Sequence, residues 1–401
     1  MTASDPRDER DPHREPSDDE LLEVVTRALS IGRERATLHA THASRVVVGG
    51  GFAIKFKRRV NLGFLDQRSI DSRGRLCRDE VRLNRRLASE VYLGVVALRA
   101  VGVALELDAV PRGTSDRLEP DAPPLRAGGE DESSTPSPGT IVDWAVVMRE
   151  LPQELMLDQL FRSDEQSRTP EMSAALARVP QHLEQLAARL ADFHRHAERG
   201  PEIAAQLEPA NLRARVEQLL DGLEAAIVGT AEAATAPARE SIAATPTAPA
   251  HVHAGSPALR RFLRARCLEL LESSRAVIES RRLRGCVVDG HGDLHCRNIC
   301  MTPGGAVAFD CLEFSQALRV RDTSAEMAFL AMDLEAHGRP ELAEAAIAAY
   351  LRRARRDPAT ASREADFDEP QRWYRLRDAL VRSLVELLRT AGSGSATRGP
   401  R

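Results

Sequence analysis

The chain has 401 residues, of which 42% are hydrophobic, enough for a buried core in one two-lobed molecule or two average domains. Its formal net charge is only −4, with 56 basic and 60 acidic residues, so we expect neither nucleic acid nor membrane as a partner. Residues 1–20 contain no apolar stretch of a secretory signal, and no later run approaches the length of a membrane span. We therefore expect a cytoplasmic protein.

The first part of the chain alternates β-rich runs with one helix. Residues 1–18 predict a disordered, charged tail, and an amphipathic segment follows at 19–29. Residues 45–57 are two β-rich runs split by glycines, which is typical of a hairpin. Apolar residues at helical spacing predict a helix over 75–91, and strands are expected at 95–107 and 141–148. Residues 112–140, dense in Gly, Pro and Ser, predict a flexible insertion.

The second part is mostly helical in pattern. Apolar stripes predict helices over 183–193, 258–282, 323–335, 341–355 and 369–389. A short β-turn-β unit, from Cys286 to Asp310, interrupts them. An Ala/Thr/Pro-rich insertion at 229–257 and a solvated tail at 391–401 complete the chain. The prediction is an α+β fold with two lobes, a small antiparallel-sheet lobe over 19–150 and a larger helical lobe over 151–390.

The segment His291–Asn298, followed by Asp310, carries the most chemistry. Phosphoryl transfer from ATP needs a carboxylate that orients the attacking hydroxyl and accepts its proton, and oxygen ligands that hold magnesium on the phosphates. Asp293 is the candidate base, and Asn298 and Asp310 are the candidate Mg²⁺ ligands, all with hard oxygen donors. His291 and His295 are interpreted as hydrogen-bond partners that shape the loop. The spacing favours this interpretation over separate turn-forming residues.

The motif His-Gly-Asp-Leu-His-x-x-Asn with a strand-end Asp resembles the catalytic and metal-binding loops of the aminoglycoside phosphotransferase family, within the protein-kinase-like superfamily. The resemblance covers about residues 38–350 without the two insertions. It implies a two-lobed kinase-like fold in which a strand lysine holds the ATP phosphates and pairs with a helix glutamate. Lys55 and Glu80 occupy those positions. It further implies a hinge at Arg149, Glu150 and Leu151, whose backbone bonds the adenine.

Two further segments, Asn61–Leu65 and Tyr92–Val96, resemble those of a bacterial branch of these proteins. Members of that branch often carry a second, P-loop ATPase half. No Gly-x4-Gly-Lys-Ser/Thr motif occurs in this sequence. A separately encoded P-loop ATPase is therefore a candidate partner.

The sequence also departs from the family pattern. The turn Val48–Phe52 is a short glycine run, Cys311-Leu312 follows Asp310, and Glu326 stands where the family usually has an Asp. The longer acid is expected to shift the hydrogen bonds that support the catalytic loop, with Asp322 as a candidate substitute. Recognition of an aminoglycoside would need a pocket lined with carboxylates, for which Glu313, Asp333 and Glu335 are candidates.

The sequence favours transfer of the ATP γ-phosphate to a hydroxyl of a small molecule, and other interpretations stand beside it. The glycine turn and Glu326 leave open a nucleotide-binding regulatory module without turnover. Gly292-Asp293-Leu-His295 matches the first metal motif of metallophosphoesterases, but their companion motifs are missing. The six cysteines include Cys296-x3-Cys300 without a second pair, so buried free thiols are favoured over structural zinc.

Overall fold

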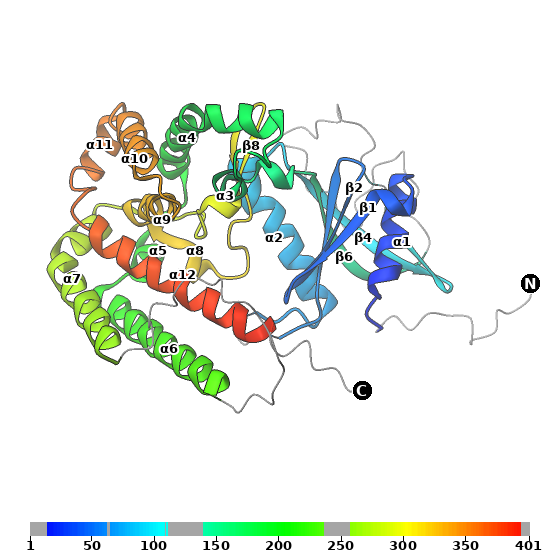
Figure 1. The fold of residues 1–401 in the computed structure, drawn as a ribbon, viewed down its shortest axis with the longest axis horizontal. Coiled ribbons are helices and arrows are strands. Elements are labelled where there is room, and N and C mark those ends of the chain that lie inside the picture. Colours follow the sequence, from blue (N-terminus) through cyan, green and yellow to red (C-terminus); the bar gives the residue numbers. More distant parts are fainter. Residues whose placement is uncertain (1–13, 62–64, 109, 111–138, 236–256, 394–401) are drawn as a thin grey trace, which may run out of the picture. The chain divides into compact units, whose positions relative to one another are not determined.

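The computed structural model describes residues 14–61, 65–108, 110, 139–235 and 257–393 (Figure 1). Most of the expected tails and insertions, at 1–13, 112–138, 236–256 and 394–401, lies outside the described residues, as do residues 62–64 of the Asn61–Leu65 segment. The chain forms two compact units, residues 1–193 with 296–319 and residues 194–295 with 320–401. Each unit is described by itself below.

The first unit is built on a six-stranded antiparallel sheet in the order β1-β2-β3-β6-β4-β5. Its strands are β1 (Ala36–Ala40), β2 (Ser44–Gly49), β3 (Phe52–Lys57), β4 (Tyr92–Val101), β5 (Ala104–Leu107) and β6 (Thr140–Arg149). Gly50 and Gly51, both with positive φ, make the tight turn between β2 and β3, as the predicted hairpin requires.

Two helices cover the two faces of this sheet (Figure 1). Helix α1 (Asp18–Leu29) begins at a capping box, in which Ser17 and Glu20 each bond the other's backbone N–H. It packs against Ile54 and Phe56 of β3, and α2 (Ile70–Ala88) packs on the opposite face. Because side chains alternate along a strand, Lys55 and Lys57 point to the face that carries α2.

The rest of the first unit lies outside this sheet, with η2 before β1 and the other elements after β6. It comprises η2 (Arg33–Arg35), η3 (Gln153–Leu155), α3 (Leu157–Arg162), most of α4 (Pro170–His196), η4 (Cys296–Asn298), β8 (Ile299–Thr302), β9 (Gly305–Ala308) and α8 (Gln316–Arg319). β8 and β9 form a two-stranded antiparallel ribbon.

The second unit is helical around one core that includes Trp373 and Tyr374. Its elements are α5 (Pro201–Ala205), α6 (Pro209–Thr235), α7 (Pro257–Leu283), β7 (Val287–Asp289), β10 (Val320–Asp322), α9 (Thr323–Ala336), α10 (Pro340–Ala354), α11 (Pro358–Arg363) and α12 (Gln371–Ser393). The expected α+β class, with an antiparallel sheet followed by a larger helical part, is confirmed.

Local differences from the sequence predictions are small. β7 pairs with β10 and not with β8, so the segment Cys286–Asp310 is not a single β-turn-β unit. α6 continues to Thr235 and α12 to Ser393, a few residues into segments expected to be an insertion and a tail. α7 begins at Pro257 and α1 at Asp18, the last residues of the expected insertion and tail. The lobe boundary at residue 150 stays a prediction.

Candidate active site

A buried ion pair joins β3 to α2 in the first unit. The Lys55 Nζ lies 2.8 Å from Glu80 Oε1 and 3.1 Å from Asp310 Oδ1. Glu80 is fully buried, whereas the Lys55 side chain keeps 16% of its surface exposed. Burial acts to lower the pKa of Lys55, but Asp310 and Glu80 outweigh it and hold that pKa well above its usual range. The ammonium group is therefore charged and faces both carboxylates.

A second lysine, for which no role was expected, shares Glu80. Lys57 Nζ bonds Glu80 Oε2 at 2.7 Å and Glu313 Oε1 at 2.6 Å, and Lys57 is buried. Burial raises the pKa of Glu80, but the two lysines outweigh it and lower that pKa to about 2. Glu80 is thus a carboxylate clamped by two cations. The two-residue spacing of the lysines on one strand was the only signal in the sequence.

Asn298 and Asp310 flank the same end of the β8–β9 ribbon in the first unit. The Phe309 N–H donates to the Asn298 carbonyl at 3.0 Å, and Asp310 follows directly. Asp310 has φ of 60°, and its N–H donates to the Tyr92 hydroxyl at 3.2 Å. Its side chain is 45% exposed. Oxygen donors of this kind, one buried amide and one accessible carboxylate, fit the preferences of Mg²⁺.

The residues after Asp310 are also tied to α2. The Cys311 N–H donates to Asn84 Oδ1 at 2.9 Å, and Glu313 bonds Lys57. Helix α2 therefore holds both the glutamate that pairs with Lys55 and the segment that carries Asp310.

The three predicted hinge residues lie at the end of β6, with Arg149 as the last residue of the strand. The Arg149 N–H donates to Val91, and the Glu150 N–H donates to Gly51. The Gly51 N–H in turn donates to Glu150 Oε2 at 3.2 Å, so the glycine turn is tied to Glu150. Leu151 is partly buried, and no hydrogen bond among the described residues uses its N–H. The Leu151 N–H is therefore a candidate donor to a nucleotide base.

In the second unit, Glu326 supports the loop that carries Asp293. Its carboxylate accepts the N–H of His291 at 2.8 Å and that of Gly292 at 2.6 Å. His194 Nε2 lies 2.7 Å from the same carboxylate. Glu326 is buried, which raises its pKa, but the bonds from His194 and the loop lower that pKa to about 2. The longer acid thus supports the loop directly.

Asp322, the expected substitute, has a different role. It caps α9 by accepting the Ser324 N–H at 2.7 Å, and it pairs with the buried Arg281 at 2.8 Å. Its other contact is the Tyr374 hydroxyl. The expectation that Asp322 compensates at the loop is therefore wrong, because its oxygens are engaged by α7, α9 and α12.

Asp293 lies on the loop that Glu326 supports, and about a third of its side chain is exposed. Its backbone N–H donates to His291 Nδ1 at 3.3 Å, and its Oδ2 lies 3.3 Å from His295 Nε2. Burial acts to raise the pKa of Asp293, but the hydrogen bond from His295 and nearby positive charges lower it. Asp293 is therefore ionised at neutral pH, as a carboxylate base requires.

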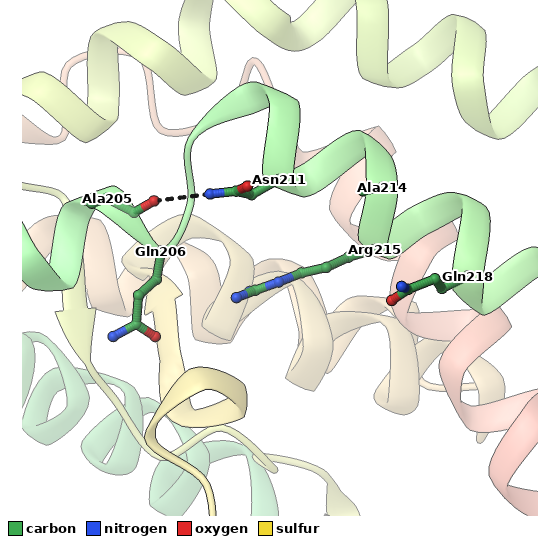
Figure 2. A pocket seen from close by; sticks show the side chains of 6 residues that line it. All are labelled: Ala205, Gln206, Asn211, Ala214, Arg215 and Gln218. Carbon is green, nitrogen blue, oxygen red and sulfur yellow. Dashed lines mark hydrogen bonds between the residues drawn. The ribbon is translucent and has the colours of Figure 1, made fainter.

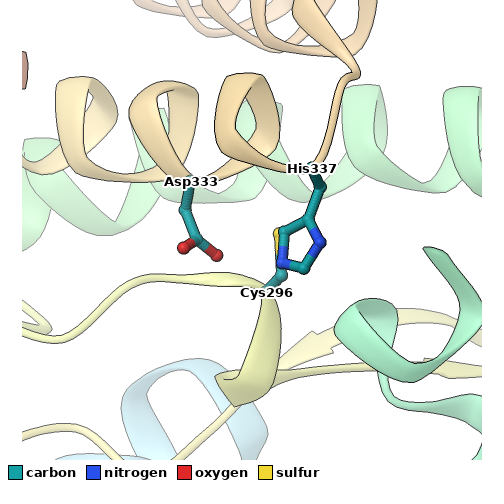
Figure 3. Close-up of side chains that lie close together, drawn as sticks. All are labelled: Cys296, Asp333 and His337. Atoms are coloured by element: carbon teal, nitrogen blue, oxygen red, sulfur yellow. The ribbon is translucent and has the colours of Figure 1, made fainter. Parts of the chain in front are cut away.

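The three acids considered for a carboxylate-lined aminoglycoside pocket are either paired with a basic residue or buried. Glu313 pairs with Lys57, Glu335 pairs with Arg375, and Asp333 is buried. Figure 3 shows Asp333 on α9 and His337 one turn later, where the His337 N–H donates to the Asp333 carbonyl.

The six cysteines are free thiols and all are buried, as expected. Burial is the main cause that raises the pKa of Cys77, Cys286, Cys300 and Cys311 to about 12. These thiols are therefore poor nucleophiles and poor metal ligands at neutral pH.

A shallow pocket lies between α5 and α6 of the second unit (Figure 2). It is lined by Ala205, Gln206, Asn211, Ala214, Arg215 and Gln218. Asn211 Nδ2 donates to the Ala205 carbonyl at 3.4 Å across it. None of the predicted site residues lines this pocket.

No family model matches the chain. Two uncharacterized proteins of Mycobacterium tuberculosis and one of Mycobacterium bovis are each 30% identical to it over 350 residues. The match covers 87% of this chain and 54% of each relative, so the chain spans about half the length of the curated relatives it matches. Choline kinase from Cryptosporidium parvum aligns at a TM-score of 0.40 and 10% identity, covering 93% of this chain and 97% of that one. Within the described residues, no helix has the length and apolar character needed to cross a membrane.

Proposed function

We propose that this protein is a kinase-like phosphotransferase that moves the γ-phosphate of ATP to a hydroxyl of a small molecule. The observation that carries the proposal is Lys55, whose ammonium contacts both Glu80 and Asp310. A strand lysine that pairs with a helix glutamate, next to a strand-end Asp, is the arrangement that protein kinases use to hold ATP phosphates and metal. The motif of the aminoglycoside phosphotransferase family supports the same assignment.

Each group has a defined part in nucleotide binding under this proposal. Lys55 supplies positive charge to the phosphates, and Glu80, fixed by Lys57, keeps the Lys55 ammonium in place. The Leu151 N–H is the proposed donor to adenine. Asn298 and Asp310 would hold Mg²⁺, which would offset the negative charge of the phosphates.

Asp293 is the proposed base. The acceptor O–H gives its proton to Asp293 while a new bond forms between the acceptor oxygen and the γ-phosphorus. The bond from that phosphorus to the oxygen bridging the β- and γ-phosphates breaks, and ADP leaves with the electron pair. His295 holds Asp293 in its ionised form, and Glu326 fixes the loop through His291 and Gly292.

A regulatory, nucleotide-binding module without turnover is the second candidate. The hydrogen bond from the Gly51 N–H to Glu150 Oε2 favours it, because this bond occupies one of the glycine-turn N–H groups that could otherwise bind a phosphate. Glu326, which first motivated this alternative, instead bonds the catalytic loop and so supports the enzyme proposal.

Asp293→Asn tests the proposal because it removes the base with little change in shape. We expect ADP release in the presence of hydroxyl compounds to fall at least about 100-fold, the range of general-base contributions, while ATP-analogue binding persists. Asp164→Asn, which changes an exposed acid, is the matched control and should keep full turnover. Turnover retained in Asp293→Asn contradicts the base assignment. Nucleotide binding by the wild-type protein without turnover on a broad panel favours the regulatory module.

A further inference from the structure

An arginine from α12 stands beside the proposed base in the second unit. Arg382 Nη1 lies 3.3 Å from His295 Nε2. His295 Nε2 also lies 3.3 Å from Asp293 Oδ2. In the tautomer with hydrogen on Nε2, His295 donates to Asp293, and in the other it accepts from Arg382. His295 Nε2 therefore bonds either the base or the arginine, according to its tautomer, and the arginine lies next to the base in both cases.

Arg382 differs from the other arginines near this loop in its partners. Arg321 donates to the Gly292 carbonyl and pairs with both oxygens of Asp378, and Arg377 also pairs with Asp378. No carboxylate of the described residues forms an ion pair with Arg382 within 4.0 Å. Its side chain is half-buried. The Arg382 guanidinium is thus a positive charge, with N–H groups that can donate hydrogen bonds to a ligand, next to the proposed base Asp293.

Two acids of α9 and α12 in the second unit are already engaged by arginines. Glu335 pairs with Arg375, and Asp378 pairs with Arg321 and Arg377. Helix α12 carries five arginines against two acids, Asp378 and Glu386, so its formal charge is +3. A cationic acceptor beside Arg382 would meet repulsion from this helix.

We infer that the acceptor carries an anionic group, a carboxylate or a phosphate, close to the hydroxyl that is phosphorylated, and that Arg382 binds this group. A guanidinium presents parallel N–H donors that match the oxygens of either group. This inference rests on the proposed phosphotransferase function. It assigns Arg382 as a specificity-determining residue and excludes aminoglycosides and amino alcohols as preferred acceptors.

The test uses two series of acceptors that differ mainly in charge. The first is glycerate, glycerol phosphate, glycerol and aminopropanediol, and the second is gluconate, glucose phosphate, glucose and glucosamine. The full chain is assayed for ADP release with ATP and Mg²⁺. The inference predicts the highest kcat/KM for an anionic member, and the carboxylate and phosphate arms show which of the two groups is bound.

Variants at Arg382 then separate a binding role from a structural one. Arg382→Gln should raise KM for the preferred anionic acceptor about tenfold or more, the worth of a charged hydrogen bond, with a smaller change in kcat. Arg382→Lys should recover part of the loss. Arg372→Gln, the same change at an exposed arginine of the same helix, is the control and should keep the wild-type KM.

Preference for a neutral or amine-bearing acceptor, acceptance of no anionic member, or an unchanged ratio of anionic to neutral kcat/KM in Arg382→Gln overturns the inference. ATP-analogue binding is measured in parallel on the same samples. Failure of the wild-type protein to bind the analogue rejects the proposed function itself, which distinguishes the two failures.

Discussion

The Glu326 carboxylate accepts the backbone N–H of Gly292 at 2.6 Å, from inside the core of the second unit. Glu326→Ala leaves two loop N–H groups and His194 without this buried acceptor. We expect the free energy of unfolding to fall by about 3–5 kcal/mol, the usual cost of breaking a buried charged network. Urea unfolding measures the effect. Glu344→Ala, at an exposed helix position, should stay within about 0.5 kcal/mol of the wild type, and equal effects would reject the supporting role.

Gly290 lies against the Glu326 carboxylate. A Cβ atom there would lie 2.6 Å from Glu326 Oε2, and this oxygen is held in place by its hydrogen bonds. Gly290→Ala should therefore lower stability by about 1–3 kcal/mol through overpacking and should reduce turnover. Gly200→Ala, where a Cβ meets nothing within 4 Å, is the control. Wild-type turnover and stability in Gly290→Ala would show that the loop does not need this close approach.

Lys55 and Lys57 share Glu80 but should respond differently to substitution. Lys57→Met leaves the Glu313 carboxylate, whose side chain is 9% exposed, without this partner, so we expect a loss of about 3 kcal/mol in stability. Lys55→Met keeps the Lys57–Glu80 pair and should lose less stability, yet weaken ATP-analogue binding at least about tenfold. Urea unfolding and calorimetric titration measure the two effects. If Lys55→Met lost more stability and Lys57→Met lost more affinity for the ATP analogue, the roles assigned to the two lysines would be reversed.

The depressed pKa values of Glu80 and Glu326 set the dependence of stability on pH. Both lie at about 2 in the folded chain against an ordinary 4.5, so the unfolded chain binds more protons between these values. Their stabilising contribution is fully present above pH 4.5 and is lost as pH falls towards 2. We expect the urea midpoint to fall between pH 5 and pH 3, and to fall less steeply in Glu326→Gln. If the urea midpoint of Glu326→Gln fell as steeply with pH as that of the wild type, the depressed pKa assigned to Glu326 would be contradicted.

The sequence allowed the Lys55–Glu80 pair and Asp310 to be placed because each lies at a recognisable position, on a strand, on a helix or at a strand end. Lys57 could not be separated from a solvated strand lysine, because its partners Glu80 and Glu313 come from distant parts of the chain. The α+β class followed from the change in hydrophobic period along the chain.

Other features had no local signal at all. β10 has three residues, too few for a period, so its pairing with β7 depends on the tertiary fold. Whether Asp322 or Glu326 supports the loop depends on which face of α9 meets it. Arg382 and His295 are 87 residues apart in the sequence, so residue spacing could not predict their contact.

The central claim is that Lys55 and Asp310 belong to a site for ATP with Mg²⁺, and calorimetric titration with a non-hydrolysable ATP analogue tests it most directly. We predict binding that strengthens when Mg²⁺ is added to the wild-type protein, and loss of that Mg²⁺ dependence in Asp310→Asn, which keeps the shape of the side chain. Absence of analogue binding by the wild-type protein, or binding indifferent both to Mg²⁺ and to Asp310→Asn, would contradict the account.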